Sequence, residues 1–242
     1  MDGALILAVA LSGLLIGFGK AGVAGTVGPF VTVLMALTIP ADEAIGLLLP
    51  MLIVADGFSV AAHWRGWDGP VALRLILAAV VGIAFGSLVL SALSETVLRN
   101  VIAVATLLFV VAFAWLRRGG TPPLRASSLG VVAGATSGLT STLAHIGGPP
   151  IVMYLMSVRL SPVRLVATSV AFFAVVNLLK VPGYLVAGLF DPELIVSTAW
   201  VWPLIPGGVW LGRRMVGRID RDRFDRITLV LLAAGAVVLL VT

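Results

Sequence analysis

Long apolar stretches, separated by short segments rich in charge, proline or glycine, run along this sequence from end to end. Six of them have roughly the 20 residues that a helix needs to cross a hydrocarbon layer of about 30 Å. These six stretches are 41–64, 70–93, 95–116, 163–189, 191–212 and 224–241. None of them shows the short alternating pattern of strands in an outer-membrane barrel. The pattern therefore predicts an all-α polytopic membrane protein.

Two further apolar units are interrupted in the middle. Residues 4–18 and 29–39 are joined by "GKAGVAGTVG", and residues 127–145 and 149–158 are joined by "HIGG". The second arm of each unit is too short to cross the hydrocarbon layer as a straight helix, because a helix rises only about 1.5 Å per residue. Each unit is therefore either one interrupted span or a hairpin that returns to the side from which it entered.

The positions of the arginines favour hairpins. If both interrupted units are hairpins, thirteen of the fourteen arginines lie on one side of the membrane and only Arg99 lies on the other. If both units are single spans, the arginines divide nine against five. Since basic residues gather on the cytoplasmic side, the hairpin arrangement is expected, with both termini outside the cytoplasm.

This arrangement predicts two inverted repeats. Each half then has three complete crossings and one hairpin, and two similar halves with an odd number of crossings must be inverted relative to each other. A short match supports the duplication, because Gly28-Pro29 falls on Gly148-Pro149 at an offset of 120 residues. The expected first repeat is 1–120, with hairpin 4–39 and helices 41–64, 70–93 and 95–116. The expected second repeat is 121–242, with hairpin 127–158 and helices 163–189, 191–212 and 224–241.

Composition agrees with a membrane protein and excludes several other classes. The 242 residues are 60% hydrophobic and 11% charged, which leaves no polar surface for a soluble domain. The net charge of +5 comes from arginines in short loops, so we expect it to report membrane orientation and not nucleic-acid binding. No cysteine is present, which excludes disulfides, thiolate metal sites and a cysteine nucleophile. We expect the first apolar stretch to be retained, because Asp2 stands where a signal peptide has basic residues.

The interruptions themselves suggest an anion site. Pro29 and Pro149 mark helix starts, since proline at the first position of a helix gives up only an amide that would be unpaired. Two helices that begin inside the membrane present partly positive N-termini, which suit an anion. In the alternative interpretation, the breaks are kinks whose backbone is satisfied by nearby Ser and Thr. We favour the site, because the break occurs in both halves.

Two lysines, an acid and an amide lie at membrane depth near the breaks. Lys20 lies beside the first break, and Lys180 lies deep in the stretch 163–189, one turn after Asn177. A charged side chain in the membrane is costly, so it is a functional candidate by default. Asp56 is expected either to pair with one of the lysines or to carry a coupling proton.

His145, at the second break, has two open interpretations. It either exchanges a proton or donates to an anion, or it caps broken backbone. Hydroxyl side chains nearby, Thr26, Thr140 and Ser141 among them, are further candidates for the wall of a cavity. The sequence contains no HExxH, GxSxG or P-loop motif, so no catalytic residue is predicted.

At these residues the chain resembles the sulfite exporter TauE/SafE family of bacterial inner-membrane proteins. The resemblance is carried by "GTVGPFVTVLMAL" and "ADEAIGLLLPMLIVAD" in the first half, and by "GATSGLTSTLAHIGGPPIVMYLM" and "SPVRLVATSVAFFAVVN" in the second. The resemblance implies transport of sulfite, sulfoacetate or a related sulfur-containing anion.

We therefore expect a secondary transporter that exports a small anion bound between the two helix starts. The expected binding residues are Lys20, Thr26, Gly28, Thr140, Ser141, His145, Gly147, Gly148, Asn177 and Lys180, with Asp56 and His145 for coupling or charge pairing. The expected partners are the anion, the lipid bilayer, a coupling proton and a second copy of the chain, with no nucleic acid, cofactor or metal. Two alternatives stay open: a membrane-embedded enzyme that uses His145 and Asp56, and an anion channel of the same architecture.

Overall fold

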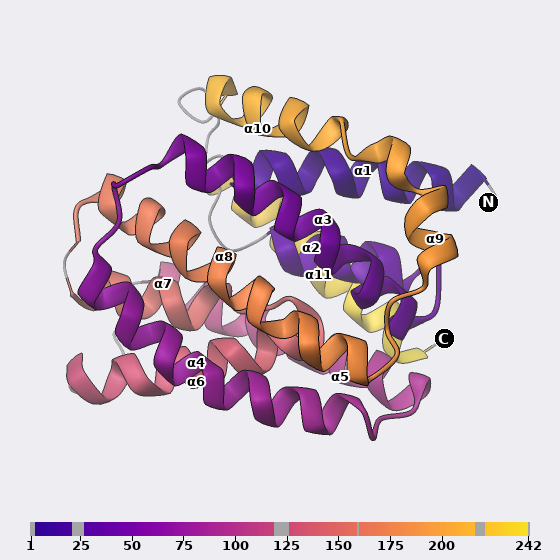
Figure 1. Ribbon diagram of the computed structural model, residues 1–242, viewed down its shortest axis with the longest axis horizontal. Helices are drawn as coiled ribbons and strands as arrows, with labels where there is room; N and C mark the ends of the chain where they lie inside the picture. Colours follow the sequence, from indigo (N-terminus) through magenta and orange to yellow (C-terminus); the bar gives the residue numbers. More distant parts are fainter. Residues whose placement is uncertain (1–2, 21–26, 119–125, 159, 216–220, 242) are drawn as a thin grey trace.

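The computed structural model describes residues 3–20, 27–118, 126–158, 160–215 and 221–241 (Figure 1). Within these ranges the regular elements are all helical. In chain order they are α1 (Gly3–Lys20), α2 (Val27–Ala36), α3 (Ala41–Ala62), α4 (Gly69–Leu90), α5 (Glu95–Arg117), α6 (Ala126–Ala144), α7 (Gly148–Ser157), α8 (Pro162–Val186), α9 (Pro192–Ser197), a 3-10 turn (Ala199–Val201), α10 (Leu204–Met215) and α11 (Arg221–Val241).

Six of the described helices are long and apolar enough to cross a membrane, namely α1, α3, α4, α5, α8 and α11. Their exposed surfaces are covered with large apolar side chains, as on Leu77, Val81 and Leu88 of α4. Such side chains suit lipid, where water is absent and every backbone polar group must be satisfied within the protein. The prediction of an all-α polytopic membrane protein is confirmed.

Both interrupted units fold as a long helix followed by a short one. The first unit is α1 and α2, the second is α6 and α7, and the short helices α2 and α7 have 10 residues each. In each unit the short helix packs against its own long helix. Both chain termini lie at the same end of the bundle (Figure 1), as expected for an even number of crossings, whether the interrupted units are hairpins or single spans.

One expected helix is divided in the structure. The sequence predicts a single helix over 191–212, but this segment forms α9, a 3-10 turn and α10. Asp191 caps α9 by accepting from the amides of Glu193 and Leu194. Pro203 then stands in the gap before α10, where its missing N–H prevents a continuous ladder of helical hydrogen bonds. This segment is therefore made of two helical pieces, α9 and α10, joined by the 3-10 turn.

Glycines bring the long arms of the hairpins close to their neighbours. The closest packed pairs are α4 with α6 and α1 with α10, which lie side by side in Figure 1. A Cβ at Gly82 of α4 would lie 2.7 Å from the amide nitrogen of Leu139, and a Cβ at Gly17 of α1 would lie 2.9 Å from that of Val209. Small residues permit this backbone contact in membrane helices. Each hairpin is thus held by a helix from the other half of the chain.

The first prediction concerns which ends of the bundle face the cytoplasm. Ser91 follows α4 at the end poor in arginine, and Gly69 begins the same helix at the arginine-rich end; both are exposed. The native chain has no cysteine, so single cysteines report without background. A membrane-impermeant thiol reagent added to intact cells should label Ser91→Cys, while Gly69→Cys should react only after the membrane is opened. Labelling of Gly69→Cys alone in intact cells would reverse the orientation.

Candidate functional site

The two interruptions of the chain lie against each other. Gly28, near the start of α2, packs so closely on the second break that a Cβ there would lie 2.8 Å from the carbonyl oxygen of His145. His145 follows the last residue of α6 and has a φ of 55°, a left-handed conformation that is uncommon for a residue with a side chain. Gly28 and Gly148, at the starts of α2 and α7, both line one cavity. The folded chain therefore brings the two short helix starts to the same place.

Hydroxyl groups on α6 satisfy the carbonyls of the second break. Ser137 Oγ donates to the carbonyl of Gly147 at 2.7 Å, and Thr140 Oγ1 donates to the carbonyl of Ile146 at 2.9 Å. The amide of Gly148 has no recorded acceptor within the described part of the chain. Because Pro149 and Pro150 have no N–H, this amide is the main donor at the start of α7. The break thus leaves a donor available, while the carbonyls of Ile146 and Gly147 accept from α6.

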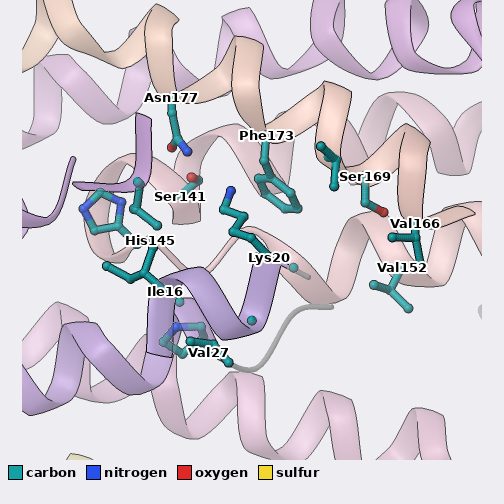
Figure 2. A pocket seen from close by; sticks show the side chains of 16 residues that line it. Ile16, Lys20, Val27, Ser141, His145, Val152, Val166, Ser169, Phe173 and Asn177 are labelled. Atoms are coloured by element: carbon teal, nitrogen blue, oxygen red, sulfur yellow. The ribbon is translucent and has the colours of Figure 1, made fainter. Parts of the chain in front are cut away.

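The cavity between the breaks is large enough for a small anion. It holds about 100 Å³ of space open to water-sized molecules, whereas a single water needs about 10–15 Å³ on the same measure. Figure 2 shows Lys20 extending toward Ser141, Asn177 and Phe173 across this space. The rest of the wall is mainly apolar, with Ile16, Val27, Leu52, Val152, Val166 and Val170. The cavity therefore has a small polar region within a hydrophobic lining.

An ion pair at one side of the cavity connects three helices. The ammonium of Lys20, the last residue of α1, contacts Oδ1 of Asp56 on α3. Asn177 Nδ2 on α8 donates to the other carboxylate oxygen, Oδ2, at 2.5 Å. Asp56 is buried, and Lys20 Nζ also lies 5.6 Å from the centroid of the Phe173 ring. Asp56 is thus the partner of Lys20, and its two oxygens both accept from residues that line the cavity.

A second buried cation lies behind the opposite part of the wall. Lys180 is fully buried on α8, and its Nζ lies 3.2 Å from both the carbonyl oxygen and Oγ of Ser141 and 3.0 Å from His145 Nδ1. His145 Nε2 lies 3.1 Å from the carbonyl oxygen of Ile45. Since a carbonyl only accepts, Nε2 carries the imidazole proton, and Nδ1 accepts from Lys180. This arrangement gives the three N–H donors of an ammonium three acceptors beside a neutral imidazole.

The cavity extends in one direction along α8. Its lining residues on this helix run from Asn177 back to Val166, toward the end where Arg164 is exposed. Beyond Lys180 in the other direction the side chains are closely packed. Tyr184 is fully buried and donates its hydroxyl to the carbonyl of Thr142 at 2.7 Å. Within the described residues, the cavity therefore extends from the breaks toward the arginine-rich end, and closely packed side chains lie on its other side.

The predicted site residues fall into two groups around this cavity. Six of them line it: Lys20, Gly28, Ser141, His145, Gly148 and Asn177. Four others lie behind the wall, where Asp56 and Lys180 contact lining residues while Thr140 and Gly147 take part in hydrogen bonds that hold the break. Thr26 lies outside the described residues. Anion binding by these residues stays a prediction.

Sequence reasoning missed the part of the wall that α8 contributes. Val166, Ser169, Val170 and Phe173 all line the cavity, and Figure 2 shows Val166, Ser169 and Phe173 along the same helix as Asn177. Their spacing of three or four residues places them on one helical face with Asn177. The sequence could have revealed this face, because positions three or four residues apart before Asn177 lie on the same side of a helix. Its apolar character hid it among the many apolar positions of the chain.

The polar groups that face the cavity suit an anion more than a metal. Lys20 supplies a charged donor. The Ser141 oxygen accepts from Lys180, so its hydroxyl proton is available to donate. The amide of Gly148 adds a donor at the start of α7. Charged and helix-terminal donors of this kind hold carboxylates and oxyanions. Among the described residues, no group of three or more His, Asp or Glu side chains could hold a metal ion.

Comparison with known protein families gives one match over nearly the whole chain. The family model for the sulfite exporter TauE/SafE matches residues 5–239. Among the curated proteins and the solved structures, none matches the chain.

Lys20, which is partly buried, and Lys180, which is fully buried, should differ in what their loss does to stability. Lys20→Met leaves the buried carboxylate of Asp56 with only the amide of Asn177, and breaking a buried ion pair in this way costs about 3–5 kcal/mol. Lys180→Met removes a cation that contacts no acid, and the relief of its burial offsets part of the lost hydrogen bonds. Thermal unfolding of the purified variants in detergent should therefore show the larger loss for Lys20→Met. A larger loss for Lys180→Met would mean that Lys180 is chiefly a structural residue.

Proposed function

The chain belongs to the sulfite exporter TauE/SafE family, and from this premise we propose that it is a secondary transporter that exports a small sulfur-containing anion. The proposed substrate is sulfite or an organosulfonate such as sulfoacetate. It binds in the cavity between the starts of α2 and α7. The protein then works in the bacterial inner membrane with both termini outside the cytoplasm.

The observation that carries this proposal is the meeting of two broken helices beside buried cations. Gly28 and Gly148 face one cavity, and Lys20 and Ser141 add donors from α1 and α6. Discontinuous helices whose N-termini point at a common point near mid-membrane form the anion sites of many secondary transporters. The family match and this geometry support the same activity independently.

The packing of the described helices supports alternating access. We propose that residues 1–120 and 121–242 form two inverted repeats that move against each other. The reciprocal contacts support this division, because α1 packs on α10 in the same manner as α6 packs on α4. The cavity extends toward the arginine-rich end and is separated from the other end by Tyr184 and the bond from His145 to Ile45. We interpret this arrangement as the conformation that receives substrate from the cytoplasm.

The contact between His145 and Lys180 supports coupling to protons. A proton added at His145 Nδ1 would face the Lys180 ammonium, 3.0 Å away. Two positive charges at this distance repel, so one of the two side chains would have to move. Displacement of either side chain would also break the bond from His145 to Ile45. We propose that proton exchange at this pair accompanies the change between the two conformations.

Transport explains the site better than the two alternative functions. A membrane-embedded enzyme would need His145 and Asp56 to act on one substrate, but Asp56 is occupied by Lys20 and Asn177, and His145 by Lys180 and Ile45. A channel would need a continuous path, whereas Tyr184 lies fully buried beyond the break. Recovery of chemically unchanged solute supports a transporter over an enzyme, and flux that saturates supports it over a channel.

The proposal is tested by flux in proteoliposomes. The native protein should move labelled sulfite or sulfoacetate across the bilayer, and flux should saturate with substrate concentration. Gly28→Ala places a Cβ 2.8 Å from the carbonyl oxygen of His145, so it should separate the two breaks and reduce flux at least tenfold. Gly57→Ala is the matched control, because a Cβ on this exposed glycine of α3 meets nothing within 4 Å. Equal flux in both variants would contradict a site at the breaks.

Substitution of the histidine tests the coupling. His145→Gln keeps a side-chain donor and acceptor but cannot titrate. We expect the variant to bind substrate with an affinity within a few-fold of the native protein, while its flux no longer responds to an imposed pH gradient. The measurement is flux with and without that gradient at equal substrate. An unchanged response to the gradient would assign His145 only the role of a cap on the broken backbone.

A further inference from the structure

The charge around the cavity determines which anions fit it. Besides His145, three ionisable side chains contact the lining: Lys20, Asp56 and Lys180. Lys180 Nζ has three acceptors around it, an arrangement that suits an ammonium. The imidazole of His145 is neutral in this arrangement, because Nε2 donates to Ile45 and Nδ1 accepts from Lys180. Residues 21–26, which join α1 and α2, contain no charged residue in the sequence. With Lys180 as an ammonium, these side chains together carry one positive charge in excess.

Asp56 already acts as a built-in anion for one of the two lysines. Its Oδ1 contacts Lys20, and its Oδ2 accepts from Asn177 at 2.5 Å. Both oxygens of this buried carboxylate are thus occupied by donors. A substrate that reaches the cavity therefore meets a Lys20 whose charge is largely neutralised, and only the charge of Lys180 is left for it to balance.

From this balance we propose that the site selects an organic monoanion over a dianion, with Asp56 as the residue that sets the charge. The inference rests on the proposed function, since it concerns the same cavity, and it narrows the proposed substrates: a singly charged sulfonate is favoured over sulfoacetate, whose carboxylate carries a second charge. A monoanion brings the buried site to neutrality. A dianion leaves a net negative charge next to Asp56, in surroundings where an uncompensated charge is costly.

The apolar wall is an independent argument for the same class. The donors gather at the breaks, around Lys20, Ser141 and Gly148, whereas Val152, Val166, Val170 and Phe173 line the rest. A doubly charged oxyanion would exchange a complete hydration shell for these few donors and a hydrophobic surface. A sulfonate with a small apolar substituent places its charged end at the donors and its substituent on this surface.

Methanesulfonate and sulfate test the charge directly. The two have similar size and shape, and neither changes its protonation near neutral pH, so they differ in charge and in one methyl group. Calorimetric titration of the purified full-length protein should show methanesulfonate binding at least tenfold more tightly than sulfate. In Asp56→Asn the amide has nearly the same shape as the carboxylate but carries no charge, so the charge of Lys20 is no longer neutralised. The ratio of the methanesulfonate affinity to the sulfate affinity should then fall at least tenfold.

Two controls separate charge from structural damage. Lys20→Gln/Asp56→Asn removes both members of the ion pair, keeps the net charge and should keep the native preference for methanesulfonate, even if both anions bind less tightly. Asp191→Asn changes an exposed acid that caps α9 and does not line the cavity, and asparagine caps equally well. This variant should leave both affinities unchanged.

The outcomes distinguish this inference from the proposed function. If the native protein binds sulfate as tightly as methanesulfonate, or if Asp56→Asn folds and keeps the native ratio, the charge selection is overturned while the anion site stands. If the native protein binds neither these anions nor sulfite, the proposed function itself is overturned and this inference with it. If Asp56→Asn fails to fold, the native ratio and the double variant decide the question.

Discussion

A helix that is interrupted inside a membrane must satisfy its own backbone polar groups, because lipid offers no hydrogen bonds. The rest of the site follows from how this protein meets that requirement. Ser137 and Thr140 occupy the carbonyls of Gly147 and Ile146, and the backbone of Gly28 packs on the carbonyl of His145. The two hydroxyls satisfy two carbonyls of the break, the close packing of Gly28 shields a third, and a helix start is left facing the cavity. The contacts that satisfy the broken backbone within the membrane thus also leave donors that suit an anion.

The buried charges are arranged around this break and not at random along the helices. Lys180 satisfies its three donors on Ser141 and His145, both of which belong to the break. Lys20 and Asp56 join α1 to α3, and Asn177 adds α8 to the same group. Any movement of α1 or α8 relative to α3 therefore changes the charges that face the cavity. This is the physical link that we propose between substrate binding and the conformational change of the transporter.

Much of the fold was predictable, because membrane helices follow directly from length and hydropathy. Gly28-Pro29 and Gly148-Pro149 marked the breaks, and helices do start there or next to them. The choice of partner for Asp56 was not predictable, since Lys20 and Lys180 were both candidates and only the packing of α1 against α3 brings Lys20 to it. The division of 191–212 near Pro203 was missed because the apolar run around it is long enough for a span, although Pro203, Pro206 and Gly207-Gly208 marked the break. The lining from α8 was missed because Val166 and Phe173 are not distinguishable by type from side chains that face lipid.

The most direct test of an anion site between the two breaks is a crystal structure with 2-bromoethanesulfonate, whose bromine is located by its anomalous scattering. We expect the sulfonate near Gly28, Gly148 and Ser141, and the bromine against the apolar surface formed by Val152, Val166 and Val170. Bromine density at another place in the protein, with the space between the two helix starts free of the anion, would contradict the account.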